Sequence, residues 1–200
     1  MKLPNFVLSL PAWTEDFQFK SDIIYPTVED RMRLVIELSK MNVQHGTGGP
    51  FGAAIFDTHT NKLISFGVNL VISSYCSAAH AEIVAIIIAQ QLQKNYDLGS
   101  EGSPSYELVS SVEPCAMCFG AISWSGIRRL VCGARGEDAH RIGFDEGPKM
   151  KTWVKELEVR DISVLQDVCR KEAVSVLNMY QKSGGLIYNA RQGSELSVSI

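Results

Sequence analysis

The 200-residue sequence has no long apolar run, no internal repeat and no low-complexity segment. Its longest strongly apolar stretch falls well short of the ~20 residues that a membrane-spanning helix needs. The N-terminus also has no long apolar segment of the kind that marks a secretory signal. We therefore expect a soluble, cytoplasmic protein with no membrane partner.

Positive charge is also scarce. The formal net charge is −3 at pH 7 and the calculated pI is 5.8, whereas a general nucleic-acid-binding surface shows clustered Lys and Arg. The local basic pair Arg128-Arg129 is interpreted as the solvated end of a strand. The charge balance therefore argues against a nucleic acid as a partner.

The five cysteines are an odd number and show no disulfide spacing. Two of them, Cys115 and Cys118, are three residues apart and directly follow Pro114. Because proline suits the first turn of a helix, this spacing predicts two sulfur atoms on one face of a helix N-terminus, where the thiolate form that zinc requires is favoured. The other three cysteines are predicted to be small buried hydrophobic residues: Cys76, Cys132 and Cys169.

The triplet His80-Ala81-Glu82 supplies the other groups that a zinc enzyme needs. It opens an apolar run, Ile83 to Ala89, that predicts a buried helix, and residues two apart in its first turn point in different directions. His80 can therefore bind a metal together with the two cysteines while Glu82 reaches past it toward a substrate. Three protein ligands leave one tetrahedral position open for water, which is typical of catalytic rather than structural zinc.

Each of these parts has a plainer interpretation when taken alone. A C-x-x-C pair is often a structural zinc site or a redox pair, and a single histidine usually has no ligand role. A structural zinc site would need a fourth ligand, for which Cys76 is the nearest candidate. The combination of H-x-E with a later P-C-x-x-C is far more specific, because it is the signature of zinc-dependent nucleobase deaminases. It predicts hydrolytic deamination with Zn²⁺ as the cofactor.

Alternating hydrophobic patterns predict an α/β protein in one domain, residues 1–200. The capping-box pattern Thr27-Val28-Glu29-Asp30 opens a helix that ends near Gly46. Gly48-Gly49-Pro50 then precedes a hairpin, and we expect parallel pairing after it. The expected elements are strands at 51–56 and 62–68, a helix at 80–94, a strand at 106–112, a helix from 115, a strand at 129–134, an irregular segment, a strand at 162–168 and a helix at 171–181.

Four motifs in this arrangement resemble a known family. They are Gly48-Gly49-Pro50-Phe51-Gly52-Ala53, His80-Ala81-Glu82, Glu113-Pro114-Cys115-Ala116-Met117-Cys118 and Gly143-Phe144-Asp145-Glu146. Together they resemble the cytidine/deoxycytidylate deaminase superfamily, and most of all the guanine deaminases with the cytidine-deaminase fold. The resemblance implies a three-layer α/β/α fold with a central five-stranded mixed sheet. It divides the chain into an irregular extension at 1–26, a deaminase core at 27–188 and a tail at 189–200.

The resemblance also implies roles for individual residues. His80, Cys115 and Cys118 would bind zinc, and Glu82 would carry a proton from the water to the leaving amine, a step that typically contributes ~10²–10⁴-fold to the rate. Contacts to a small nucleobase are implied for six residues: Asn69, Phe51, Ala81, Trp124, Glu146 and Tyr188. The first of these could instead cap a turn, and the two aromatic residues Phe51 and Trp124 could be ordinary core residues.

Glu146 is predicted to select the substrate. An ionised carboxylate only accepts hydrogen bonds, so an acidic side chain in the pocket favours a base that presents N–H donors, as guanine does. The resembling family usually has aspartate at this position, and glutamate is one methylene longer. Glu146 could also carry a proton, or it could form a solvated acidic pair with Asp145.

We therefore predict conversion of guanine to xanthine and ammonia, and hypothesise activity on aminotriazines such as ammeline. One alternative is deamination of tRNA adenosine or of another nucleobase or nucleoside, since Leu130 to Arg135 also resembles the tRNA-specific branch. Another is a non-catalytic zinc scaffold in which Glu82 has no role. The resemblance further implies a homodimer with exchanged C-terminal segments, in which Gly184-Gly185 is a joint and Tyr188 closes the partner's pocket.

Overall fold

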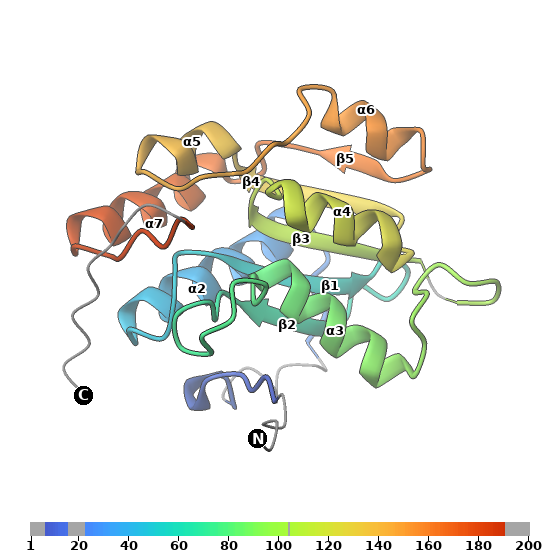
Figure 1. Ribbon diagram of the computed structural model, residues 1–200. Helices are drawn as coiled ribbons and strands as arrows, with labels where there is room; N and C mark the ends of the chain where they lie inside the picture. The colour runs from blue at the N-terminus through green and yellow to red at the C-terminus, as the bar shows by residue number, and fades with distance from the viewer. Residues whose placement is uncertain (1–6, 16–22, 104, 191–200) are drawn as a thin grey trace, which may run out of the picture.

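Five β-strands form one mixed sheet with helices on both of its faces (Figure 1). The computed structural model describes residues 7–15, 23–103 and 105–190. In spatial order the strands are β2 (Leu63–Val68), β1 (Gly52–Asp57), β3 (Tyr106–Val112), β4 (Arg129–Ala134) and β5 (Ser163–Leu165). β1 pairs antiparallel with both β2 and β3, whereas β3, β4 and β5 are parallel to one another. The predicted five-stranded mixed sheet is confirmed.

The helices complete a three-layer α/β/α arrangement. One face of the sheet packs against α2 (Val28–Gln44), α5 (Gly136–Arg141) and α7 (Arg170–Lys182), and the other against α3 (Ala81–Gln93), α4 (Ala116–Ser125) and α6 (Trp153–Glu158). A short 3-10 helix, η1 (Ala12–Thr14), lies in the N-terminal segment. Within the described ranges, no helix combines the length and the hydrophobicity that crossing a membrane requires.

Each central strand contributes side chains to both layers because successive residues of a strand point to opposite faces. Val109 belongs to the core beneath α2 and α7, and its neighbour Leu108 to the core beneath α3 and α4. All seven residues of β3 are buried. The buried residues of β3 include Glu107, Ser110 and Ser111, so a strand covered on both faces here still contains polar side chains.

Two predictions about the elements were wrong. The segment expected to be irregular contains α5 and α6, and the strand expected at 162–168 is only the three residues of β5. Both helices have six residues, which is under two turns, so they carry too little hydrophobic periodicity to be detected. The predicted capping box is confirmed, because Asp30 N donates to Thr27 Oγ1 at 3.1 Å and Thr27 N to Asp30 Oδ2 at 3.3 Å.

The cysteines follow the prediction in part. All five are free thiols. Cys132 is buried in the core as expected, whereas Cys76 and Cys169 are only partly buried. Pro114 lies just before α4 rather than in its first turn, since Cys115 is the N-cap residue and the helix begins at Ala116.

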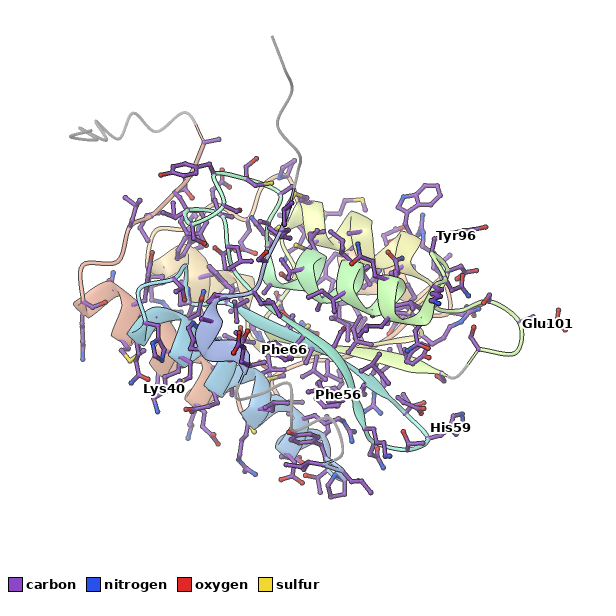
Figure 2. The ribbon with its side chains drawn as sticks, turned by 90° about the horizontal axis from the view of Figure 1, so that it is seen from below. Lys40, Phe56, His59, Phe66, Tyr96 and Glu101 are labelled. Carbon is purple, nitrogen blue, oxygen red and sulfur yellow. The ribbon has the colours of Figure 1, made fainter. Side chains whose placement is uncertain are left out.

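The sheet topology gathers several chain ends at one edge. β2 and β3 both run antiparallel to β1, so their carboxyl ends lie at the edge where β1 begins. In Figure 2, His59 marks the β1–β2 turn at the opposite end of this hairpin. The segments that follow β2 and β3 carry the His80 and Cys115 motifs, so the topology brings these motifs to the same edge of the sheet.

Candidate active site

Two helix N-termini present the three predicted metal ligands. His80 is the N-cap residue of α3, and Cys115 is the N-cap residue of α4. Cys118 lies in the first turn of α4 and is fully buried. Figure 1 shows α3 and α4 running across the same face of the sheet, which brings these two helix starts together.

The three ligand atoms have the spacing of a tetrahedral zinc site. His80 Nδ1 lies 3.5 Å from Cys115 Sγ and 3.6 Å from Cys118 Sγ. Zinc bonds of usual length at tetrahedral angles would separate a nitrogen and a sulfur ligand by about 3.6 Å. In the part of the chain that the structure describes, the group able to hold a metal consists of these three residues without Cys76. The donor set therefore fits zinc and leaves one position for a non-protein ligand.

The surroundings of Cys115 favour its thiolate. The pKa of Cys115 is lowered to about 4, first because the Cys118 side chain hydrogen-bonds to it and then because of His80, while burial opposes the shift. A thiolate is the form that coordinates zinc. The protein surroundings alone therefore favour a negatively charged sulfur at Cys115, without a contribution from a bound metal ion.

Glu82 lies beside the ligands without belonging to the ligand group. It is 6% exposed. Burial raises the pKa of this carboxyl, and the nearby Cys115 thiolate raises it further. The carboxyl therefore holds a proton more readily than an exposed glutamate does, which suits a group that accepts and returns protons.

A cavity of about 230 Å³ opens next to these groups. Four of the six predicted substrate contacts contribute to its wall, together with the predicted proton carrier Glu82: Phe51, Asn69, Glu146 and Tyr188. Other residues that line it carried no predicted role: Val71, Ser77, Glu113, Gly147, Asn189 and Ala190. The cavity has room for one small planar ring beside the metal ligands.

Two of the predicted substrate contacts do not line this cavity. Trp124 is 87% exposed near the C-terminal end of α4. It is nine residues from Cys115, a distance of roughly 13 Å along a helix, and therefore cannot form the wall beside the metal in its own chain. Ala81 is fully buried and packs into the core beneath α3. Neither Trp124 nor Ala81 lines the cavity of the described chain, and their contact with a substrate stays a prediction.

Glu146 is not part of a solvated acidic pair. Its Oε2 atom is buried without a hydrogen-bond partner. Burial raises the pKa of Glu146 to about 8, although Lys149 opposes the shift. Asp145, in contrast, is exposed and its Oδ1 accepts a 2.8 Å hydrogen bond from Gly147 N. Glu146 thus offers a carboxyl oxygen without a partner to a ligand that enters the cavity.

Aromatic side chains form the apolar part of the wall. Phe51 and Tyr188 both contact Phe144 edge-on, with ring centres 4.9 and 5.0 Å apart. The Tyr188 hydroxyl is buried with no hydrogen-bond partner. Asn189 fastens this segment, since its Oδ1 accepts from Asp145 N at 2.9 Å and its Nδ2 donates to Gly143 O at 2.8 Å. Tyr188 therefore closes the cavity of its own chain; the tail beyond residue 190 lies outside the described residues.

Asn69 combines its two predicted roles. Its Oδ1 accepts a 3.3 Å hydrogen bond from Val71 N, which is a turn-capping contact, and the residue also lines the cavity. The local bond fixes the plane of the side-chain amide. A fixed amide in a cavity wall is suited to recognising a polar ring edge.

The buried carboxylate of Glu113 is a site feature to which the sequence reasoning gave no role. Its Oε2 accepts from Gly136 N at 3.1 Å, and its Oε1 accepts from the Gln166 side chain. These partners are separated from it by 23 and 53 residues. The sequence signal that could have identified Glu113 is a charged residue directly before Pro-Cys, at the end of a buried strand.

Comparison with known proteins supports the site at two levels. Residues 26–134 match the family described as the cytidine and deoxycytidylate deaminase zinc-binding region. The chain is 35% identical to guanine deaminase of Bacillus subtilis strain 168 over 138 residues, which are 69% of this chain and 84% of the relative. It is also 34% identical to a tRNA-specific adenosine deaminase of Buchnera aphidicola over 134 residues, 67% and 81% of the two chains.

Solved structures are similar over most of the chain. The protein NE0047 in complex with 2,6-diaminopurine matches with a TM-score of 0.85 and 44% identity over 92% of this chain and 97% of that one. A guanine deaminase from Nitrosomonas europaea matches with a TM-score of 0.83 and 41% identity over 89% and 97%. The similarity to these two structures therefore extends over about nine tenths of the chain.

Proposed function

We propose that this chain, which belongs to the cytidine and deoxycytidylate deaminase zinc-binding family, hydrolyses guanine to xanthine and ammonia. The chain is a zinc-dependent aminohydrolase. The observation that carries the proposal of guanine is the unpartnered, buried Oε2 of Glu146 in the same cavity as Glu82 and the His-Cys-Cys group. A buried acceptor without a partner selects a ring that presents N–H donors.

The chain's own residues supply proton transfer and orientation. When bound by His80, Cys115 and Cys118, zinc lowers the pKa of a water molecule and so supplies a nucleophile near neutral pH. Glu82 takes up a proton and delivers it to the amine that leaves the ring. In the overall reaction guanine and water give xanthine and ammonia, so no redox partner is needed.

Recognition of the ring uses the remaining cavity residues. Glu146 accepts hydrogen bonds from the ring and amine N–H groups, and the Asn69 amide meets the opposite polar edge. Phe51 and Tyr188 enclose the ring faces. The similarity to NE0047, which was solved with 2,6-diaminopurine and with 8-azaguanine, supports a purine-sized ligand.

The proposal is tested by ammonia release from a panel of guanine, cytosine, cytidine, adenine, ammeline and tRNA. We expect guanine to have the highest kcat/KM, and chelation of zinc to abolish turnover until Zn²⁺ is restored. Ammeline is included because its amines lie on carbons flanked by ring nitrogens, as in guanine. Turnover of cytidine or tRNA without turnover of guanine would reject the proposal.

A second candidate is deamination of tRNA adenosine, which the Buchnera aphidicola relative supports. Binding to tRNA weakens steeply with added salt, whereas turnover of a free base is nearly insensitive to it. The net charge of −3 favours the free base. Assays at about 50 and 200 mM salt therefore separate the two candidates.

The homodimer with exchanged C-terminal segments stays a prediction. Tyr188 and Asn189 contact the cavity of their own chain, so an exchange would move the same contacts to a second copy. Sedimentation velocity of the purified protein checks the oligomeric state. A monomer at all concentrations would contradict the dimer while leaving the single-chain cavity intact.

A further inference from the structure

The Gly48-Gly49 turn touches two walls of the cavity directly. A Cβ atom on Gly48 would lie 1.9 Å from the backbone oxygen of Asn69, and one on Gly49 would lie 2.3 Å from the Tyr188 hydroxyl. Neither position leaves room for a side chain. The backbone of this turn meets Asn69 and Tyr188 with no side chain between them. The position of the turn therefore determines the position of both walls.

Asn42 holds this turn against the cavity. It lies near the C-terminal end of α2 and is 0% exposed. Its Nδ2 donates to the oxygen of Gly49 and to the oxygen of Asn69, each at 2.9 Å. One buried side-chain amide thus bridges the turn and the residue proposed to recognise the ring.

Thr47 bonds to the Asn42 side chain, and Trp13 bonds to Thr47. Thr47 Oγ1 donates to Asn42 Oδ1 at 2.7 Å, and Trp13 Nε1 donates to Thr47 Oγ1 at 3.1 Å. The Trp13 ring also stacks on His45, with ring centres 5.5 Å apart and planes 10° apart. These bonds form one series in which each donor points toward the cavity, an arrangement in which neighbouring hydrogen bonds polarise and strengthen one another.

The series ends on atoms that position the cavity. Gly49 O, which accepts from Asn42, also accepts from Phe51 N at 2.8 Å, and Phe51 O accepts from Asn69 N at 3.1 Å. Phe51 and Asn69 both line the cavity. The series therefore connects Trp13 of the N-terminal segment to both of them, 38 positions before Phe51 and 56 before Asn69.

We propose that Trp13, Thr47 and Asn42 are positioning residues for substrate recognition, acting as a Trp13–Asn69 relay from the N-terminal segment to the cavity. The inference rests on the proposed function, in which Asn69 and Phe51 hold the ring. It assigns a task to the segment before α2 that the catalytic groups do not need. The relay sets the place of Phe51 and of the Asn69 backbone without touching the substrate.

The test removes single hydrogen bonds while preserving shape. Trp13→Phe keeps an aromatic ring without the N–H, and Thr47→Val replaces the hydroxyl by a methyl group. We expect each to raise KM for guanine by about tenfold while kcat changes by less than about twofold, because binding is lost equally in the ground and transition states. Thr47→Ser, which keeps the hydroxyl, should restore KM.

Thr58→Val is the matched control. Like Thr47, Thr58 donates a hydrogen bond through its hydroxyl, in this case to the backbone carbonyl of Ser105 at 2.9 Å, at the far end of β1. We expect Thr58→Val to leave KM for guanine unchanged. The double variant Trp13→Phe/Thr47→Val should match Thr47→Val alone, since the two bonds act in one series. A tenfold increase of KM in Thr58→Val, or additive increases of KM in the double variant, would overturn the relay. So would a fall in kcat together with a fall in melting temperature in Trp13→Phe and Thr47→Val, because this would show a general loss of structure.

Amide hydrogen exchange tests the relay without turnover. In the zinc-loaded protein without substrate, the backbone N–H groups of Phe51, Asn69 and Val71 should exchange faster in Thr47→Val than in the wild type or in Thr58→Val. If the wild type does not consume guanine, the proposed function fails, and faster exchange still supports the relay. Unchanged exchange at these three amides would overturn it.

Discussion

Lys149 Nζ donates a 3.0 Å hydrogen bond to the backbone oxygen of Pro114, the residue immediately before the Cys115 ligand. The same ammonium group lies 3.5 Å from Glu113 Oε2 and 4.9 Å from the centre of the Trp153 ring. Its side chain is 12% exposed. A buried cation thus connects the segment that follows Glu146 to the turn that presents a metal ligand.

Replacing this cation should weaken the metal site. Lys149→Met removes the hydrogen bond to Pro114 and leaves Glu113 with less compensation, so we expect zinc affinity to fall by about 10–100-fold, as for other groups that orient metal ligands. Competition with a zinc chelator measures this. Lys155→Met, an exposed position on α6, is the matched control, and equal zinc affinity in both variants would contradict the prediction.

Glu82→Gln separates proton transfer from metal binding. The amide keeps the size of the side chain but cannot take up a proton, so we expect kcat to fall by at least ~10²–10⁴-fold. Zinc content and melting temperature should stay close to those of the wild type, because Glu82 is outside the ligand group. Ammonia release and elemental analysis check the two parts. Unchanged turnover would mean that Glu82 has no role in proton transfer.

Glu146→Gln tests recognition of the N–H donors of the ring. The substitution replaces a buried carboxyl, whose Oε2 has no partner, by an amide that also presents N–H donors, and we expect kcat/KM for guanine to fall by about 10–100-fold. Asp145→Asn is the neighbouring control, since Asp145 is exposed and its contact with Gly147 N survives as an amide oxygen. Steady-state measurement of kcat/KM for guanine in both variants checks this prediction. Equal losses would favour a general effect of negative charge over direct recognition.

Asp138 should make stability depend on pH. Its pKa is lowered from the usual 3.8, chiefly by hydrogen bonds from Arg170 at 2.9 and 3.1 Å. A lowered folded-state pKa stabilises the protein above the unfolded pKa, and this contribution is lost as pH falls through the folded pKa. We expect Asp138→Asn to reduce the free energy of unfolding by about 1–3 kcal/mol at pH 7, and by progressively less below about pH 4.

Urea unfolding of both proteins at several pH values checks this. Glu37→Gln is the control, because Glu37 forms an exposed pair with Lys40 at 3.6 Å and such pairs contribute little. A difference between wild type and Asp138→Asn that stays constant from pH 7 to pH 3 would show that the charge of Asp138 is not the cause.

The elements that the sequence predicted correctly are those whose signal is local. The capping box at Thr27, the hairpin after Gly48-Gly49-Pro50 and the strand 106–112 depend on residues close together in the chain. The six-residue helices α5 and α6 were missed because tertiary contacts such as Trp153 and Leu157 in the core hold them, rather than a repeating pattern.

The same reason explains why some residues predicted as cavity walls line the cavity and others do not. Phe51 and Asn69 flank β1 and β2 at the edge where the motifs meet, so their neighbourhood follows from the strand order. The resemblance to the family implied a substrate contact for Trp124, but two turns of helix carry it away from the metal and out to the surface. Closeness in sequence along a helix is a poor guide to closeness in space beyond one turn.

The sequence alone determined the chemistry of this protein, because a histidine, two cysteines and an unligated glutamate at those spacings define a zinc-dependent deaminase before any coordinate is known. Only the tertiary structure decided how that chemistry is held in place. Glu113 with Lys149, and Thr47 with Trp13, are partners 36 and 34 positions apart. These polar contacts arise from the packing of segments that are distant in the chain, and hydrophobic periodicity does not encode which polar side chains will meet.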